Sequence, residues 1–86
     1  MTLSLSDEQA LDMVRSAIGE VVAGGTELFS DISLDTKIGD LAIDSIQTME
    51  MVGVIEENLG ILFGEEELAQ VVHFRDLANL MRRAVD

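Results

Sequence analysis

Residues 44–60 read DSIQTMEMVGVIEENLG, and this stretch decides the fold. Asp44 is a favourable N-cap residue, and Gln47 follows it at the three-residue spacing of a capping box. Gly60 marks the predicted end of the helix, because glycine readily adopts the left-handed conformation that ends many helices. The pattern predicts a helix that begins abruptly, with Ser45 as its first helical residue.

The two faces of this predicted helix differ in character. One face carries residues at helical spacing and is expected to point into the core: Thr48, Met51, Val52, Ile55 and Leu59. The other face is apolar near its start and acidic along its length: Ile46, Met49, Glu50, Gly53 and Glu57. The core stripe is complete without Ile46 and Met49.

Three further helices are predicted, and no segment favours a strand. The first begins at Ser6, which has capping-box spacing to Gln9, and ends at Gly24-Gly25. The third of the four is short and begins at the acidic run 65–67. Its expected inner side is Leu68, Val71 and Val72. The last helix covers about residues 74–85, and its inner side is Phe74, Leu77, Leu80, Met81 and Val85.

Residues 26–43 form a long connection between the first two helices. Apolar positions are scattered through it: Leu28, Phe29, Ile32, Leu34, Ile38, Leu41 and Ile43. Long loops are uncommon unless they are functional or packed against the domain. We expect this one to be packed down.

Length and charge limit the classes of function. The chain has 86 residues, which predicts a single small domain, and its net charge is −12. That charge excludes ordinary nucleic-acid binding and disfavours anionic membranes, while it favours basic protein partners. No cysteine is present, so there is neither a disulfide nor a thiolate metal site. A cytoplasmic protein is the expectation, since the chain shows no membrane-spanning run and no signal-type N-terminus. A monomer is expected because the surface is so highly charged.

Catalytic and metal-binding patterns are also missing. His73 is the single histidine, and its position before the last helix predicts a capping or packing residue. Asp31, Ser33 and Asp35 alternate as in a calcium loop, but the sixth and twelfth positions hold Thr36 and Ala42 instead of glycine and glutamate. Phosphate-binding glycine loops are absent. We predict no catalytic residue and no metal site.

Three segments carry a resemblance to a known family. They are residues 36–46 (TKIGDLAIDSI), 50–61 (EMVGVIEENLGI) and 74–77 (FRDL). The first resembles the segment of acyl carrier proteins that commonly reads Asp-Leu-Gly-x-Asp-Ser-Leu, and the others resemble that family's acidic second helix and the start of its last helix. The likeness is strongest over residues 40–61 and implies an all-α, four-helix bundle with a long first loop and a short third helix, forming one stand-alone carrier domain over residues 1–86.

The resemblance also implies a site. Ser45 would carry 4′-phosphopantetheine, transferred from coenzyme A by a separate Mg²⁺-dependent phosphopantetheinyl transferase. In the family, the aspartate that matches Asp44 also helps at the metal site of the transferase. The terminal thiol of the arm would hold an acyl group as a thioester. A chain without cysteine would thus perform thiol chemistry with a sulfur that its cofactor brings.

Partner contacts follow from the same resemblance. Ile46 and Met49 would be apolar contacts beside the attachment point. The acidic residues would meet basic docking faces on acyl-loading, acyl-transfer or ketosynthase-type enzymes: Glu50, Glu56 and Glu57. The chain departs from the usual family pattern at Ala42, Gly53, Phe63-Gly64 and His73, and Gly53 leaves a shallow notch on the partner-facing side. These departures favour a specialised pathway, such as polyketide biosynthesis or an aminoacyl-loading system.

The sequence leaves other functions open. Peptidyl carriers more often show Gly-Gly-x-Ser-Leu and are less acidic, so Asp44 and the net charge favour an acyl carrier, although an aminoacyl cargo stays open. An unmodified acidic interaction module would use Ser45 only as a helix-start residue. A hydrolase using Ser45 lacks a base. Val52, Ile55 and Leu80 fit a cargo cavity or a solid core, and we expect the core because protein interiors are close-packed.

Overall fold

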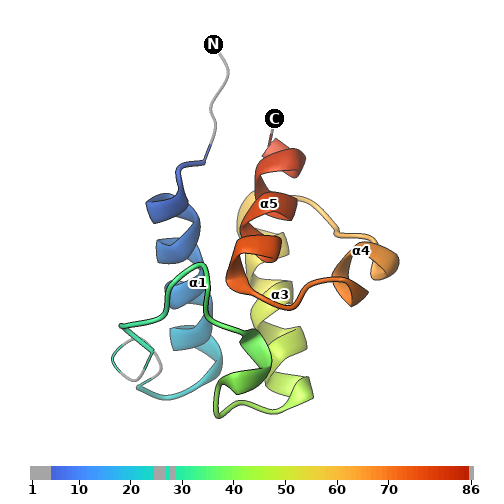
Figure 1. The fold of residues 1–86 in the computed structure, drawn as a ribbon. Coiled ribbons are helices and arrows are strands. Elements are labelled where there is room, and N and C mark those ends of the chain that lie inside the picture. The colour runs from blue at the N-terminus through green and yellow to red at the C-terminus, as the bar shows by residue number, and fades with distance from the viewer. Residues whose placement is uncertain (1–4, 25–26, 28, 86) are drawn as a thin grey trace.

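The structure is a computed structural model that describes residues 5–24, 27 and 29–85. Four α-helices are named in that part of the chain: α1 (Asp7–Val21), α3 (Ser45–Leu59), α4 (Glu65–Ala69) and α5 (Phe74–Val85). A 3₁₀ helix, η1 (Ile38–Asp40), lies in the long connection. Helices α1, α3 and α5 stand together, and the short α4 lies to one side (Figure 1). The predicted all-α fold with a short third helix is confirmed.

The core is built by three helices rather than four. Helix α1 packs against both α3 and α5. The buried apolar residues of these helices are Ala10, Val14, Ala17, Ile18, Met51, Ile55, Phe74, Leu77, Ala78, Leu80 and Met81. Within the described chain, α4 contributes no buried residue. Burial of this apolar surface is the main favourable contribution to folding, and α4 adds little to it.

Helix α1 begins as predicted and ends earlier than predicted. The Gln9 N–H donates to Ser6 Oγ at 3.1 Å, and the Ser6 N–H donates to Gln9 Oε1 at 2.9 Å, which completes the capping box. The helix ends at Val21, with Val22 extended at φ −119°. Consecutive β-branched residues favour extended backbone, which explains the early end. Gly24 is left-handed at φ 75°, whereas Gly25 lies outside the described residues.

The long connection is packed down, as predicted. Ile32, Leu34 and Ile38 are buried; Leu28 falls outside the described residues. The connection also pairs with the segment before α5. The Ile38 N–H donates to the Val72 carbonyl at 2.9 Å, and the Phe74 N–H donates to the Thr36 carbonyl at 3.1 Å. The loop is therefore fixed to the start of α5 by backbone as well as by burial.

Asp76 caps the start of α5. Its Oδ2 accepts the backbone N–H groups of Val72 and His73, each at 3.0 Å. These two hydrogen bonds hold the pKa of the Asp76 carboxyl below its usual value. The imidazole Nδ1 of His73 lies 3.7 Å from the same oxygen, so the side chain that caps this helix start is Asp76 and not His73.

The described residues were also compared with what a membrane span and a metal site require. No helix in the described ranges combines the length and the apolar character that crossing a membrane requires. The same part of the chain holds no group of three or more His, Asp or Glu side chains arranged to bind a metal ion.

Candidate functional site

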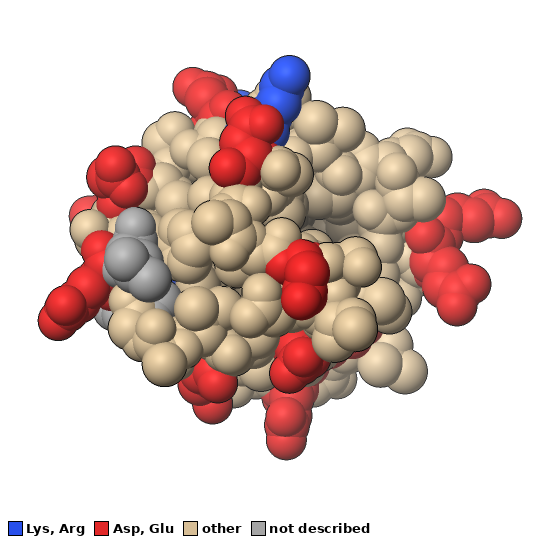
Figure 2. All heavy atoms as spheres, turned by 90° about the horizontal axis from the view of Figure 1, so that it is seen from below, with Lys and Arg blue, Asp and Glu red and all other residues tan. Residues whose placement is uncertain are grey.

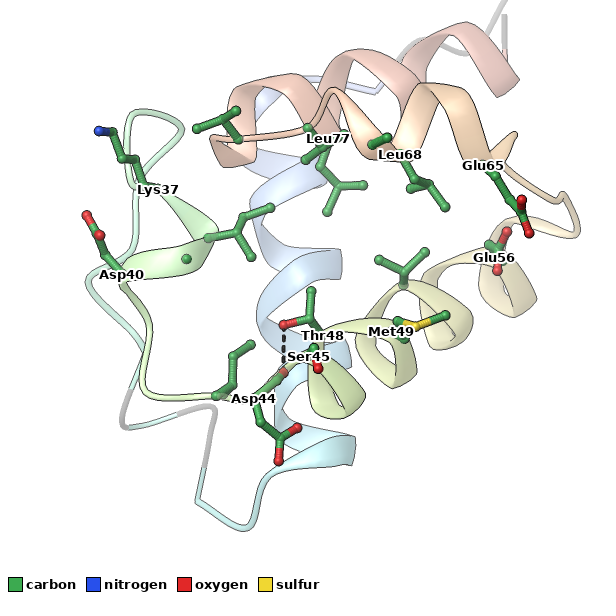
Figure 3. A pocket seen from close by; sticks show the side chains of 17 residues that line it. Lys37, Asp40, Asp44, Ser45, Thr48, Met49, Glu56, Glu65, Leu68 and Leu77 are labelled. Carbon is green, nitrogen blue, oxygen red and sulfur yellow. Dashed lines mark hydrogen bonds between the residues drawn. The ribbon is translucent and has the colours of Figure 1, made fainter.

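The site begins at the N-terminus of α3, where the predicted capping box is present. The Gln47 N–H donates to Asp44 Oδ1 at 2.7 Å, and the Asp44 N–H donates to Gln47 Oε1 at 3.1 Å. The Thr48 hydroxyl donates to the Asp44 carbonyl at 2.9 Å, as the dashed line in Figure 3 shows. Asp44 and the first turn of α3 are thus fixed relative to each other.

Ser45 is the first residue of α3, and its side chain is exposed. No side chain or carbonyl among the described residues hydrogen-bonds its hydroxyl. The first turn of a helix also leaves backbone N–H groups without intrahelical acceptors, and with the helix dipole they favour an anion. The position therefore suits a hydroxyl that is reached by another protein and then carries a phosphodiester.

A groove of about 940 Å³ opens beside Ser45. It lies between α3, α4 and the two paired loop segments (Figure 3). Its lining is largely apolar: Ile38, Ile43, Met49, Val52, Leu68, Ala69, Val71, Val72 and Leu77. Glu56 and Glu65 lie at the end away from Ser45, where their side chains point toward each other (Figure 3). An apolar group brought close to Ser45 would therefore find an apolar surface beside it.

The groove corrects two expectations. Helix α4 ends at Ala69, so Val71 and Val72 lie after it and are not part of its inner side. Leu68 and Val71 are half-buried, Val71 packs against the core, Val72 is 49% exposed, and all three line the groove. Of the residues expected in a solid core, Ile55 and Leu80 are buried, whereas Val52 is half-buried: it packs against the core and also lines the groove. The physical reason is that α4 has only five residues and lies to one side of the bundle, so its apolar face does not close onto α3.

The second face of α3 is as exposed as its sequence pattern predicts. The exposed fractions are 68% for Ile46 and 75% for Met49. Glu50 and Glu57 are exposed farther along this face. Glu56 differs from them, because it is half-buried and its Oε2 accepts the Phe63 N–H at 2.7 Å. It lines the groove as well.

Sequence reasoning did not find Leu62 as a site residue. It lies in the loop between α3 and α4 and is 88% exposed, more than any other large apolar side chain among the described residues. Together with Gly53, Gly60 and Ile61 it lines a second hollow, which Glu56 and Glu57 also line. In the sequence, Leu62 follows the helix-ending Gly60 and Ile61, but periodicity does not show which residue of a short apolar run is exposed.

The charge of the molecule is distributed over its surface. From below, Asp and Glu side chains are spread around the rim of the visible face and also lie near its middle, and Lys or Arg is seen at one edge (Figure 2). Four arginines form ion pairs with carboxylates: Arg15 with Asp12, Arg75 with Asp35, Arg82 with Asp7 and Arg83 with Glu67. The field around the molecule is therefore negative, which favours a basic partner.

Comparison with known proteins identifies the family. The family described as "Phosphopantetheine attachment site" matches residues 14–81, which includes the whole site. No curated protein and no solved structure matches the chain significantly. The family is defined by 4′-phosphopantetheine held covalently on a serine, and its members are carrier domains that interact with phosphopantetheinyl transferases and acyl-processing enzymes. The exposed serine hydroxyl fits that group as an attachment point, and the helix N-terminus fits its phosphodiester. The chain thus belongs to the phosphopantetheine-binding carrier family, of the acyl carrier protein type.

Proposed function

We propose that Ser45 is the attachment residue for 4′-phosphopantetheine. The observation that carries this proposal is the exposed hydroxyl at the first position of α3, directly after the Asp44 cap. In the transfer, Ser45 Oγ forms a bond to the phosphorus next to pantetheine, the phosphoanhydride bond of coenzyme A breaks, and adenosine 3′,5′-bisphosphate leaves with the bridging oxygen and its electron pair. The proton of Ser45 Oγ passes to a base on the transferase or to water. The arm then supplies the thiol on which acyl groups are held as thioesters.

Asp44 has two roles in this proposal. Its carboxylate caps α3 and so fixes the position of Ser45. An exposed carboxylate next to the reacting hydroxyl also suits the Mg²⁺ site of the transferase, because Mg²⁺ prefers oxygen ligands and one or two carboxylates. These roles are separable, since an asparagine keeps a capping oxygen but loses the charge.

The groove beside Ser45 supports a proposal about the cargo. An acyl chain that enters it would contact Val52, Leu68 and Leu77 and leave water. Burial of apolar surface stabilises by about 25 cal/mol per Å². We propose that the groove covers the first part of an acyl cargo between encounters with enzymes.

The exposed face of α3 supports a proposal about partners. Ile46 and Met49 lie beside the attachment point, and Glu50, Gly53 and Glu57 follow along the same face. Glu56 adds charge at the boundary with the groove. We propose that this face docks on basic surfaces of the transferase and of acyl-loading, acyl-transfer or ketosynthase-type enzymes. Charge complementarity raises the rate of encounter and suits transient contacts.

We also propose a biosynthetic pathway, an oligomeric state and a cellular compartment for this carrier. Gly53, Phe63-Gly64 and His73 depart from the usual family pattern and support a role in polyketide or related specialised biosynthesis; an aminoacyl cargo is the alternative. We propose that residues 1–86 form one carrier domain that acts as a monomer in the cytoplasm. The shared core of α1, α3 and α5 supports the single domain, and a chain without cysteine needs no oxidising compartment.

The proposed attachment is tested by intact-mass measurement. The chain is incubated with coenzyme A, Mg²⁺ and a broad-specificity phosphopantetheinyl transferase. The wild type is expected to gain one phosphopantetheine moiety, Ser45→Ala none, and the control variant Ser30→Ala one. An unchanged mass of folded wild type with several transferases would contradict the proposal. Competition between acyl and aminoacyl donors in loading assays then separates the two kinds of cargo.

A further inference from the structure

Two carboxylates face each other at one end of the groove. Glu56 comes from α3 and Glu65 from the first position of α4, and their side chains point toward each other at the end away from Ser45 (Figure 3). One oxygen of Glu56 accepts the Phe63 N–H at 2.7 Å, which holds this carboxylate in place. The lining of the groove therefore changes from apolar side chains to an acidic end.

No cation of the described chain balances these two carboxylates. None of the ion pairs among the described residues includes Glu56 or Glu65. Lys37 is the one basic residue in the described lining of the groove, and it lies on the opposite side from the two glutamates (Figure 3). Like charges that face each other repel, and a positive charge between them is attracted to both. The acidic end thus suits a cation that comes from outside the chain.

The length of the prosthetic arm matches the length of the groove. Glu56 is eleven residues beyond Ser45 in α3, which places it about 16 Å along the axis at 1.5 Å per residue. In 4′-phosphopantetheine about thirteen bonds join phosphorus to sulfur, so the extended arm spans about 15 Å by the dimensions of an extended peptide chain. An arm that lies along the groove therefore brings its sulfur, and the first atoms of its cargo, to the two carboxylates.

We propose that Glu56 and Glu65 select a cargo that carries a protonated amine close to the thioester, as an aminoacyl group does. The inference rests on the proposed function and narrows the class of cargo that this site takes. The ammonium group would lie between the two carboxylates, while the arm covers the apolar lining that Val52 and Leu68 provide. A cargo with a carboxylate at the same place would be repelled.

The test uses the full chain, loaded by the transferase with three short cargoes of matched size. Each cargo is joined to the arm through an amide in place of the thioester, so that it does not hydrolyse. β-Alanyl ends in an ammonium group, butanoyl in a methyl group and succinyl in a carboxylate. NMR spectra give the ratio of seated to free cargo, from the amide shifts of Glu56 and Glu65 and from nuclear Overhauser contacts between the cargo and the Leu68 side chain.

The ratio of seated to free cargo should be higher for β-alanyl than for succinyl in the wild type. Glu56→Gln and Glu65→Gln should each lower the β-alanyl ratio by about threefold, the scale of one exposed ion pair. The same variants should leave the butanoyl ratio unchanged and raise the succinyl ratio. Glutamine at position 56 keeps an oxygen for the Phe63 N–H, so the wall of the groove stays in place.

Glu66→Gln is the matched control, because Glu66 is an exposed acid of α4 that does not line the groove. It should change none of the three ratios. Equal ratios for β-alanyl and succinyl, or the same response of β-alanyl and butanoyl to Glu56→Gln and Glu65→Gln, would overturn the inference. A fall in the β-alanyl ratio as large with Glu66→Gln as with Glu65→Gln would also overturn it, because the overall negative charge would then explain the effect.

The mass assay keeps the two proposals apart. A modified chain whose three cargoes behave alike overturns the cargo selection alone. A folded chain that takes up no phosphopantetheine overturns the carrier proposal and the cargo selection together.

Discussion

Asp44 and Gln47 exchange two hydrogen bonds across the first turn of α3, at 2.7 Å and 3.1 Å, and Ser45 lies between them in the sequence. The pair satisfies two backbone N–H groups at the helix start, one on each residue. It also determines where the helix begins, and so which residue presents its side chain at the exposed first position. The placement of the serine hydroxyl is therefore a consequence of helix capping.

The two proposed roles of Asp44 are separable by substitution. Asp44→Ala is expected to lower the free energy of unfolding by about 1 kcal/mol, because a capping oxygen is lost. Asp44→Asn keeps an oxygen for the Gln47 N–H and should unfold near the wild type in urea. If Asp44 also serves the transferase metal, the asparagine variant should still be modified more slowly. If the wild type and Asp44→Asn were modified at equal rates, Asp44 would act only as a helix cap, and its role at the transferase metal would be contradicted.

Gly53→Ala is expected to stabilise the fold. Alanine in a helix interior is favoured over glycine by about 0.5–1 kcal/mol, and the added methyl group meets no neighbour within 4 Å. The denaturant midpoint should therefore rise without a change in slope. A fall in stability would contradict the open surroundings of Gly53.

The groove predicts that a longer cargo stabilises the protein. A chain loaded with an octanoyl arm should melt at a higher temperature than one loaded with an acetyl arm, because more apolar surface leaves water on entry to the groove. Ala69→Phe, which places a ring on the groove wall, should reduce this difference. The matched control is Ala84→Phe, at an exposed position of α5 that does not line the groove. Identical melting of the two loaded forms would contradict a role of the groove in holding cargo.

The lowered pKa of Asp76 predicts that the folded chain loses stability in acid. The backbone hydrogen bonds from His73 and Val72 lower its pKa in the folded chain below 3.8, the ordinary value. The unfolded chain then binds the proton more readily, so the contribution of Asp76 is complete above about pH 3.8 and is lost as the pH falls through the folded pKa.

Asp76→Asn provides the measurement. Its deficit in unfolding free energy relative to wild type should be full at pH 7 and should shrink below pH 4 in urea titrations at fixed ionic strength. Glu66→Gln, on the exposed surface of α4, serves as the control for loss of one charge. A deficit that stays constant from pH 7 to pH 3 would contradict the role given to the Asp76 carboxylate.

Much of the fold follows from local sequence signals. Ser6 with Gln9 and Asp44 with Gln47 determine two helix starts, because capping depends on residues three apart. The exposure of Ile46 and Met49 follows from the helical period, since the core stripe lies on another face. The identity of the candidate serine follows from its place after the Asp44 cap together with the family resemblance.

The features that sequence reasoning missed depend on how elements pack. The spacing of Leu68, Val71 and Val72 predicts one inner side of a helix, but α4 ends at Ala69, and the three side chains line a groove instead. Leu62 was part of an apolar run whose exposure depends on the path of the loop after Gly60. The early end of α1 reflects a competition between the β-branched pair at 21–22 and the later glycines.

The central claim is that one serine hydroxyl carries the arm, and peptide mapping tests it most directly. The chain is modified with coenzyme A and the transferase, digested, and sequenced by tandem mass spectrometry. The account predicts phosphopantetheine on the peptide that contains Ser45, with fragment ions that place it on that residue. Phosphopantetheine on a different serine, or a peptide that stays unmodified while a known carrier in the same tube is converted, would contradict it.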